Sequence, residues 1–186
     1  YSTVFTCASI NLWNPATGIR YAWANPEVLT EYLHEKRENS YQYAGSRSSF
    51  ADFDEDRIQD PKTHPCHHPR TAFRHVARRT DTRTLITSLA PPQTALTGKA
   101  PYLLWPEGDR SDEAYLLGVL SSIPLDWYAR RFVETGLDYH IFNSLPVPRP
   151  GQDDRLRQRT VEISGRLAAV DERYADWGES VGVDYG

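Results

Sequence analysis

The 186-residue chain lacks several features that define common protein classes. It has no Met and only two Cys, Cys7 and Cys66, so a disulfide-stabilised scaffold is excluded and a reducing compartment fits. No uninterrupted run of about 18 apolar residues occurs, which excludes a membrane-spanning helix. We therefore expect a cytoplasmic protein with no membrane partner.

The absence of Met extends to position 1, where Tyr1 opens a sequence that reads like the middle of a strand. This pattern leads us to expect a fragment of a longer protein. Hydrophobic residues make up 39% of the chain, but aromatic residues reach 12%, and such large side chains can form a packed core. A wholly disordered chain is therefore not expected.

The motifs of several enzyme classes are also missing. Neither a glycine-rich phosphate loop nor a G-x-S-x-G turn is present. The histidines and cysteine of residues 64–68 are too close together for the two-to-five-residue spacing of zinc ligands, so we expect no metal site. The acidic run of residues 52–60 is more simply a solvated loop than the carboxylate cluster of a metal-dependent nuclease, which stays the least favoured alternative.

Basic residues are unevenly distributed. Eighteen are Arg and only three are Lys, and Arg is favoured where phosphates or base edges are held by paired hydrogen bonds. The net charge is −4, yet the segment from Lys62 to Lys99 carries +6 and the remainder carries −10. A local basic segment suits phosphate binding whatever the total charge. The alternative is a solvated surface paired with the acidic flanks.

Periodicity and turn residues predict the layout of the chain. Asn25-Pro26 is typical of a helix start, and Ser111 is a second candidate cap. We expect strands over residues 1–13, 71–79, 83–89, 101–105 and 139–142, with a short extended piece over 93–97. We expect helices over residues 26–40, 52–58, 112–122, 125–133 and 152–177, and a proline-rich tether over 145–150.

These elements predict an α+β fold, in which a small, mostly antiparallel sheet and a buried helix pair are followed by a long C-terminal helix. The expected parts are an N-terminal segment over 1–68, a core over 69–150, a helix over 151–177 with a heptad-like pattern, and a frayed tail over 178–186. The heptad-like stripe predicts a helix partner, in this chain or another. Its central residues are Ile163, Leu167, Val170 and Tyr174.

Four sequence stretches occur in an order that is fairly specific. They are HPRTAFRHVARRTDTRTLITSLAPP (68–92), KAPYLLW (99–105), AYLLGVLSSIPLDWYARRFV (114–133) and YHIFNSLPVPRP (139–150). Together they resemble the C-terminal target-recognition region of TaqI-like and type IIG adenine-N6 DNA methyltransferases of restriction–modification systems. The region is also similar to the recognition domains of type I specificity subunits. The resemblance covers roughly residues 69–150, and the first 60 residues match nothing that we can place.

The resemblance implies that this chain recognises double-stranded DNA while a separate N-terminal methyltransferase domain of the same parent protein flips the adenine and methylates it. S-adenosylmethionine is expected in that domain and no cofactor in this chain. The only Pro-Pro pair here, Pro91-Pro92, lacks the preceding Asn or Asp and the following aromatic residue of the catalytic loop of amino-methyltransferases.

The residue types in the basic segment are compatible with this role, because arginine forks bind guanine edges or phosphates and hydroxyls bind phosphate oxygens. The predicted DNA-binding residues are Arg70, Arg74, Arg78, Arg79, Thr80, Thr82, Arg83 and Lys99. For Arg130 and Arg131 we favour ion pairing over DNA contact. We expect no catalytic residues in this chain. The alternative from another class is a protein-interaction module that acts through the C-terminal helix.

Overall fold

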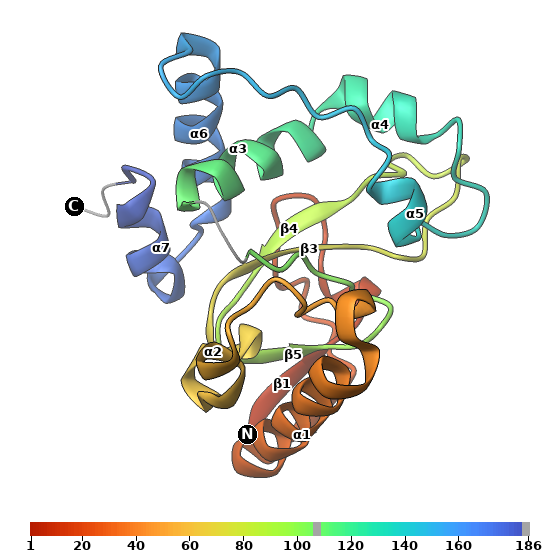
Figure 1. Cartoon of the computed structure of the whole chain (residues 1–186). Helices are drawn as coiled ribbons and strands as arrows, with labels where there is room; N and C mark the ends of the chain where they lie inside the picture. The colour runs from red at the N-terminus through yellow and green to blue at the C-terminus, as the bar shows by residue number, and fades with distance from the viewer. Residues whose placement is uncertain (106–108, 184–186) are drawn as a thin grey trace.

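The computed structural model describes residues 1–105 and 109–183 and confirms the α+β class (Figure 1). Strand β1 (Ser2–Phe5) lies at the centre of a three-stranded sheet, antiparallel to β2 (Ala22–Ala24) and parallel to β5 (Thr94–Leu96). Strands β3 (Arg70–Phe73) and β4 (Thr87–Ala90) form a separate antiparallel pair. The strands are therefore divided between two small sheets, and β2 lies in a segment for which the sequence predicted no strand.

The first long helix, α1 (Pro26–Ala44), begins as the sequence predicts and runs four residues beyond the expected end. The side chain of Asn25 accepts hydrogen bonds from the backbone N–H groups of Glu27 and Val28, and Pro26 occupies the first turn, where no N–H is needed. The predicted short helix in the acidic segment is α2 (Glu55–Gln59), which packs on α1 through buried Ile58.

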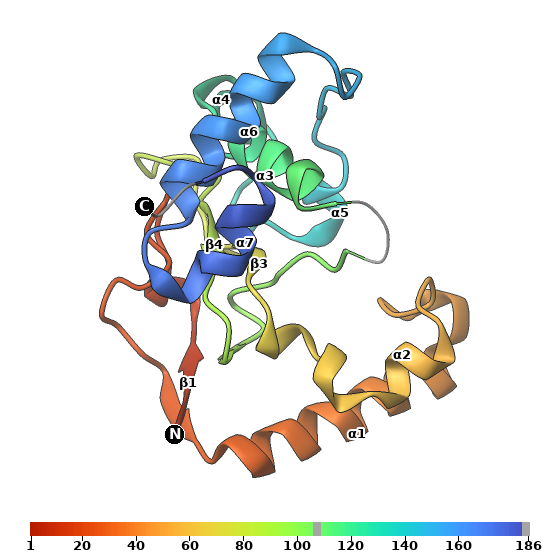
Figure 2. The ribbon, with the colours of Figure 1, turned by 90° about the vertical axis from the view of Figure 1, so that its left-hand side faces the viewer.

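Helices α3 (Arg110–Leu120) and α4 (Ile123–Ala129) match the expected helix pair. The cap of α3 is Asp109 rather than Ser111, because the Asp109 carboxylate accepts from the Asp112 N–H and Asp112 reciprocates. Helix α3 packs along α6 (Arg155–Ala168), the long C-terminal helix. Figure 2 shows these helices together in one part of the molecule, with α1 along the opposite edge.

Two hydrophobic clusters fill the helical part. One surrounds Phe73 and joins β3 to α4 and α5, with Leu120 and Leu125 among its members. The other surrounds Tyr174 and Trp177 and joins α3 to the C-terminal helices. A third cluster lies between the sheets around Ile10 and Ala72. The two sheets and the helices therefore share a connected interior.

Three predicted strands differ from the structure. Residues 139–142 form a short helix, α5 (Tyr139–Phe142), since the Asp138 carbonyl accepts from both the Ile141 and Phe142 N–H groups. The ring of Phe142 stacks on that of Phe73 with 4.2 Å between centroids. Residues 101–105 form only an isolated bridge between Tyr102 and Ala72. The N-terminal strand ends at Phe5, where a 3-10 turn over Cys7–Ser9 begins.

The predicted strands over 71–79 and 83–89 overlap β3 and β4 but share a shorter ladder. After Phe73 the two segments diverge into a wide loop, and the Arg74 N–H still reaches the Ile86 carbonyl at 3.0 Å. Apolar and polar residues alternate along this loop, as they do in a strand. Its backbone nevertheless bonds outside the β3–β4 pair, since the His75 N–H binds the Lys99 carbonyl. The loop carries most of the predicted DNA-binding residues.

The C-terminal helix is also shorter than the 152–177 expected, because α6 ends at Ala168. Asp171 caps a new 3-10 turn by accepting from the Arg173 N–H, and α7 (Ala175–Ser180) follows. The tail expected over 178–186 thus begins inside α7, and Val181 is buried. Residues 184–186 of that tail lie outside the described residues.

The heptad-like stripe does not face a single partner. Tyr174 is fully buried within this chain and donates its hydroxyl to the Leu89 carbonyl, so it is unavailable to another helix. Ile163 and Leu167 are instead on the outer face of α6, and Val170 lies two residues beyond its end; the three are 43–48% exposed. The inner face consists of Val161, Ser164, Gly165 and Ala168, whose small size allows α3 to approach closely. No helix of the described residues is both long and apolar enough to cross a membrane.

The approach of α3 to α6 depends on Gly118. A Cβ atom at this position would lie 2.7 Å from Thr160 Cγ2 and would also clash with Ser164 Oγ. We expect Gly118→Ala to destabilise the fold by about 1–3 kcal/mol through overpacking, although alanine normally favours a helix over glycine by roughly 1 kcal/mol. Urea unfolding would measure the loss, and Ser164→Ala in the same chain should recover part of it. A more stable Gly118→Ala variant would contradict this packing.

Candidate nucleic-acid interface

Two of the predicted DNA-binding arginines lie at the tip of the loop between β3 and β4. We call residues 78–82 the arginine turn. Arg78, Arg79, Thr80 and Thr82 are all exposed there. The Asp81 carboxylate accepts from the Arg78 N–H at 2.9 Å, and the Asp81 N–H binds the Arg78 carbonyl at 3.1 Å. These bonds close the turn, so hydrogen bonds within the turn itself stabilise its backbone conformation.

A buried carboxylate on α4 fixes the base of the turn. Asp126 is 5% exposed, and its Oδ1 atom accepts from the backbone N–H groups of Thr84 at 2.8 Å and Leu85 at 2.7 Å. The Thr84 hydroxyl in turn donates to the Arg78 carbonyl at 3.0 Å. Bonds to a charged acceptor are stronger than neutral ones, so the turn is held firmly above α4.

Arg83 and Arg130 complete this support. Arg83 donates to the Ser121 carbonyl at 2.7 Å and lies 3.7 Å from Asp126. Arg130 pairs with the other Asp126 oxygen at 3.2 Å and donates to the Thr82 carbonyl. The expectation of ion pairing therefore fits Arg130. Arg83, which the sequence placed among DNA contacts, serves inside the fold.

Two further predicted contact residues are also engaged elsewhere. Arg70 is 5% exposed and donates to the His68 carbonyl at 3.2 Å and the Thr94 carbonyl at 2.7 Å. Arg74 is half-buried and donates Nε–H to the Ile10 carbonyl at 2.7 Å. Both bind backbone carbonyls, so we remove them from the interface. Lys99 is exposed on the loop after β5, away from the arginine turn in sequence.

The turn after α4 adds a cation, Arg131, for which the sequence analysis favoured ion pairing. The Arg131 guanidinium lies over the Trp127 ring, 4.1 Å from its centroid, and the described residues include no ion pair with Arg131. Trp127 and Phe132 are both more than half exposed. The signal was present in the sequence, since an aromatic residue and an arginine four positions apart share one helix face.

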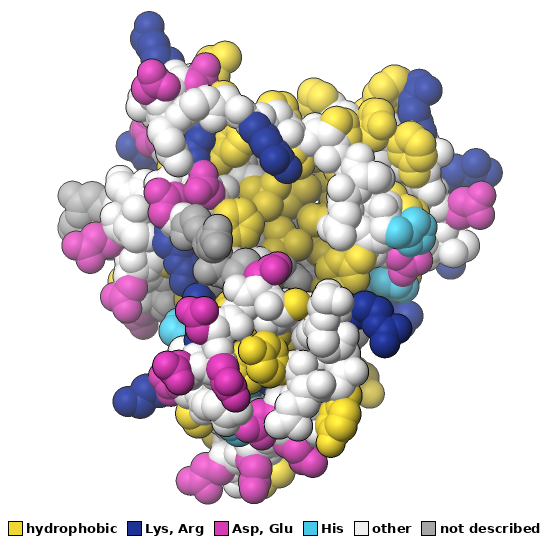
Figure 3. Space-filling view, viewed as in Figure 1, with side chains coloured by type: hydrophobic (Ala, Val, Ile, Leu, Met, Phe, Trp, Pro, Cys, Tyr) yellow, Lys and Arg dark blue, Asp and Glu magenta, His cyan; other side chains and the backbone are white. Residues whose placement is uncertain are grey.

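Surface charge is divided between the two parts of the molecule. Figure 3 shows acidic side chains gathered over α1 and α2, while the helical part above is more apolar, with Lys and Arg side chains near its margins. Figure 1 shows the loop that carries the arginine turn beside α4, on the opposite side of the molecule from α7. The +6 segment of the sequence therefore does not form one basic patch, and its exposed part centres on the arginine turn.

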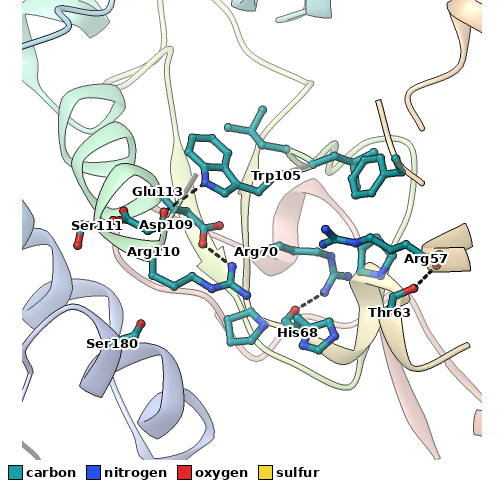
Figure 4. A pocket seen from close by; sticks show the side chains of 15 residues that line it. Arg57, Thr63, His68, Arg70, Trp105, Asp109, Arg110, Ser111, Glu113 and Ser180 are labelled. Atoms are coloured by element: carbon teal, nitrogen blue, oxygen red, sulfur yellow. Dashed lines mark hydrogen bonds and ion pairs between the residues drawn. The ribbon is translucent and has the colours of Figure 1, made fainter. Parts of the chain in front are cut away.

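The cavity in Figure 4, of about 440 Å³, lies between the segment after α2 and the start of α3. Two of its charged side chains, Arg110 and Glu113, pair with each other within the fold. Glu113 Oε2 accepts from Arg110 at 2.9 Å and from the Trp177 indole N–H at 3.0 Å, while Oε1 accepts from the Thr71 N–H at 3.1 Å. A carboxylate with this many donors is a structural hub, and we assign it no chemistry on a substrate.

The described residues contain no group of three or more His, Cys, Asp or Glu side chains arranged to hold a metal ion. The histidines of residues 64–68 diverge, with His64 contacting His34, and His68 contacting the Lys62 carbonyl. Cys7 and Cys66 are free thiols. The nuclease alternative thus has no ligand cluster to build on in this part of the chain.

No family model matches this chain, and neither the curated proteins nor the solved structures that were searched contain a match. Functional inference therefore depends on the residues and their geometry.

Removing the Asp126 carboxylate should loosen the arginine turn and weaken the whole fold. We expect Asp126→Ala to cost about 3–5 kcal/mol in unfolding free energy, since it leaves two half-buried arginines and two buried backbone donors without an acceptor. The matched control is Asp81→Ala, which removes an exposed carboxylate with one backbone bond and should cost about 0.5–1.5 kcal/mol. Chemical denaturation of both variants gives the comparison, and equal losses would contradict the role of Asp126.

Proposed function

We propose that this chain is the DNA sequence-recognition part of a larger S-adenosylmethionine-dependent, adenine-specific DNA methyltransferase of a restriction–modification system. The observation that carries the proposal is the arginine turn, in which two exposed arginines and two exposed threonines stand on a backbone fixed by Asp126. The resemblance of residues 69–150 to target-recognition regions supports the same class.

The chemistry of the turn fits duplex DNA. Arginine forks can donate two hydrogen bonds to a guanine edge or neutralise a phosphate, and threonine hydroxyls can bind phosphate oxygens. Arg131, just after the neighbouring helix α4, lies over the Trp127 ring and adds a third cation. Because the turn is anchored, its side chains lose less conformational freedom on binding than those of an unsupported loop.

The methyl-transfer chemistry belongs, in this proposal, to the N-terminal methyltransferase domain of the parent protein. The described residues offer no glycine-rich turn between a strand and a helix that would fit S-adenosylmethionine, so we assign this cofactor no site here. The part played by this chain is to hold the target duplex in register while the other domain acts on the flipped adenine.

The first test is binding of the purified chain to duplex DNA across a salt series, followed by fluorescence anisotropy. We expect affinity to fall as salt rises, because bound phosphates release counterions. In the charge-reversal variant Arg78→Glu/Arg79→Glu, affinity should fall by more than about tenfold, and the slope of log affinity against log salt should shrink by about 2.

The matched control for net charge is Arg155→Glu/Arg159→Glu, which reverses two exposed charges on α6. This control should bind nearly as wild type does. Absent or salt-independent binding by folded wild-type protein at low ionic strength would contradict the proposal. Equal losses in both double variants would show that total charge, rather than the arginine turn, controls binding.

A second candidate function, from another class, is protein interaction through α6. Its outer face exposes Leu156, Ile163 and Leu167, of which Leu156 is 79% exposed, and Val170 is exposed just beyond its end. An apolar stripe at this spacing on a helix fits a second helix, and the simplest partner is another copy of this chain.

Light scattering on Ile163→Asp/Leu167→Asp tests self-association. A dimeric wild type should become monomeric in this variant with its fold retained, whereas Gln158→Asp, on the exposed polar side of α6, should leave the mass unchanged. A wild type that is already monomeric at all concentrations would remove this candidate.

A further inference from the structure

A second cavity, of about 330 Å³, lies between α1 and the segment from β5 to Tyr102. We call it the basic cavity. Its walls include three cationic side chains, Lys36, Arg37 and Arg70, and no acidic residue is among the described residues that line it. The arginine turn contributes nothing to these walls, so the basic cavity is a separate feature.

Both arginines are buried without a carboxylate partner. Arg37 is 4% exposed and donates to the Thr63 hydroxyl at 3.0 Å and to the backbone carbonyls of Ile58 and Asp60. Arg70, at 5% exposed, also donates to carbonyls, and no ion pair within the described residues includes either guanidinium. A buried cation is normally paired, because removing an isolated charge from water is costly.

Unpaired donors are concentrated at this cavity. Five buried side-chain nitrogen or oxygen atoms of the described residues have no hydrogen-bond partner. Three of them belong to residues that line the basic cavity, namely Arg37 Nε, Arg70 Nε and Thr97 Oγ1. Buried polar groups are satisfied in most native structures, so such a cluster calls for a missing acceptor.

The other titratable groups in the walls do not neutralise the arginines. Burial raises the pKa of the Cys66 thiol and of the Tyr102 phenol, so both are neutral near pH 7. Burial and the neighbouring Arg37 lower the pKa of His64 to about 4, so this imidazole is also neutral. Arg37, Arg70, Cys66 and Tyr102 all line this one cavity. Burial lowers the pKa of Arg37, and the charges of Asp60 and Glu38, which lie outside the cavity walls, oppose this shift.

The geometry favours a phosphate over other anions. Two guanidiniums, a hydroxyl and an ammonium group surround the cavity, and a phosphate group offers three strong acceptor oxygens to meet them. The volume lies in the range of small-molecule sites, about 300–1,000 Å³, so it has room for more than a bare phosphate. Phe50, Leu96 and the Tyr102 ring supply apolar surface for an organic group.

We propose that the basic cavity binds a phosphomonoester of about mononucleotide size, with the phosphate held by Arg37, Arg70, Lys36 and Thr97. The cavity is too small for a duplex, so this binding goes beyond the proposed DNA recognition. The phosphomonoester could belong to a free nucleotide or to the 5′ end of a DNA strand.

Thermal unfolding and titration calorimetry of the whole chain test the proposal with four probes. Inorganic phosphate and adenosine 5′-monophosphate should stabilise the protein as their concentration rises, since a ligand that binds only the folded state shifts the unfolding equilibrium. Adenosine, which lacks the phosphate, should not. A short single strand with a 5′-phosphate reports whether a DNA end also enters, because its unphosphorylated twin is the reference.

Variants locate the binding. Arg70→Gln should weaken binding of adenosine 5′-monophosphate by about tenfold or more, but it removes carbonyl bonds and can impair folding. Thr97→Val avoids that problem, because it deletes a hydroxyl that has no partner in the fold. It should leave the free protein equally or more stable while weakening nucleotide binding severalfold. Lys36→Gln should also weaken binding, and the matched exposed control, Lys62→Gln, should not.

No stabilisation of wild type by phosphate or nucleotide would overturn the proposal, as would equal effects of adenosine and its monophosphate. Wild-type nucleotide affinity in both Thr97→Val and Lys36→Gln would place the binding elsewhere and overturn it as well. The Arg78→Glu/Arg79→Glu variant should bind the nucleotide normally, so failure of DNA binding and failure of this cavity are separate results.

Discussion

The constraint on which the structure depends is that two small sheets leave backbone N–H groups without strand partners, and buried groups of this kind need acceptors. Carboxylates on two consecutive helices supply them. Glu113 on α3 accepts from the Thr71 backbone, and Asp126 on α4 accepts from the Thr84 and Leu85 backbones. Each helix is thereby bonded to the sheet region through an ionised side chain. Glu113 also accepts from Trp177 and thereby fixes the position of α7, while Asp126 fixes the base of the arginine turn.

The distribution of charge along this sequence does not predict the distribution of charge on the surface of the fold. The +6 segment contains five arginines between residues 70 and 83, but three of them donate to backbone carbonyls of the fold. Arginine is suited to this use because its five donors can satisfy several acceptors at once. Only Arg78 and Arg79 of the five remain exposed. One arginine-rich segment therefore contains both arginines that stabilise the fold and arginines that lie on its surface.

Local signals in the sequence predicted the elements that local physics determines. The Asn25-Pro26 start of α1 and the fold class are confirmed, because caps and prolines act within a few residues. The apolar run at Tyr139–Phe142 is too short for periodicity to separate a strand from a helical turn. In the C-terminal helix, hydrophobic spacing continued past a break. Asp171 was the available signal there, as a residue that caps a new turn.

The candidate site was less predictable, because it depends on distant pairings. Nothing near Thr84 in the sequence indicates that Asp126, 42 residues away, accepts its N–H. The basic cavity is harder still, since its arginines come from α1 and from the start of β3. The arginine turn and the basic cavity differ in their exposure to solvent, and the kind of anion that each can bind differs accordingly. An anchored, protruding turn can follow the backbone of a long polyanion but encloses no single phosphate, whereas a cavity of about 330 Å³ admits one phosphate and excludes a duplex. Because Arg37 and Arg70 line the cavity and are not part of the turn, and Arg78 and Arg79 form the turn and do not line the cavity, each feature can bind its own anion without competing for residues.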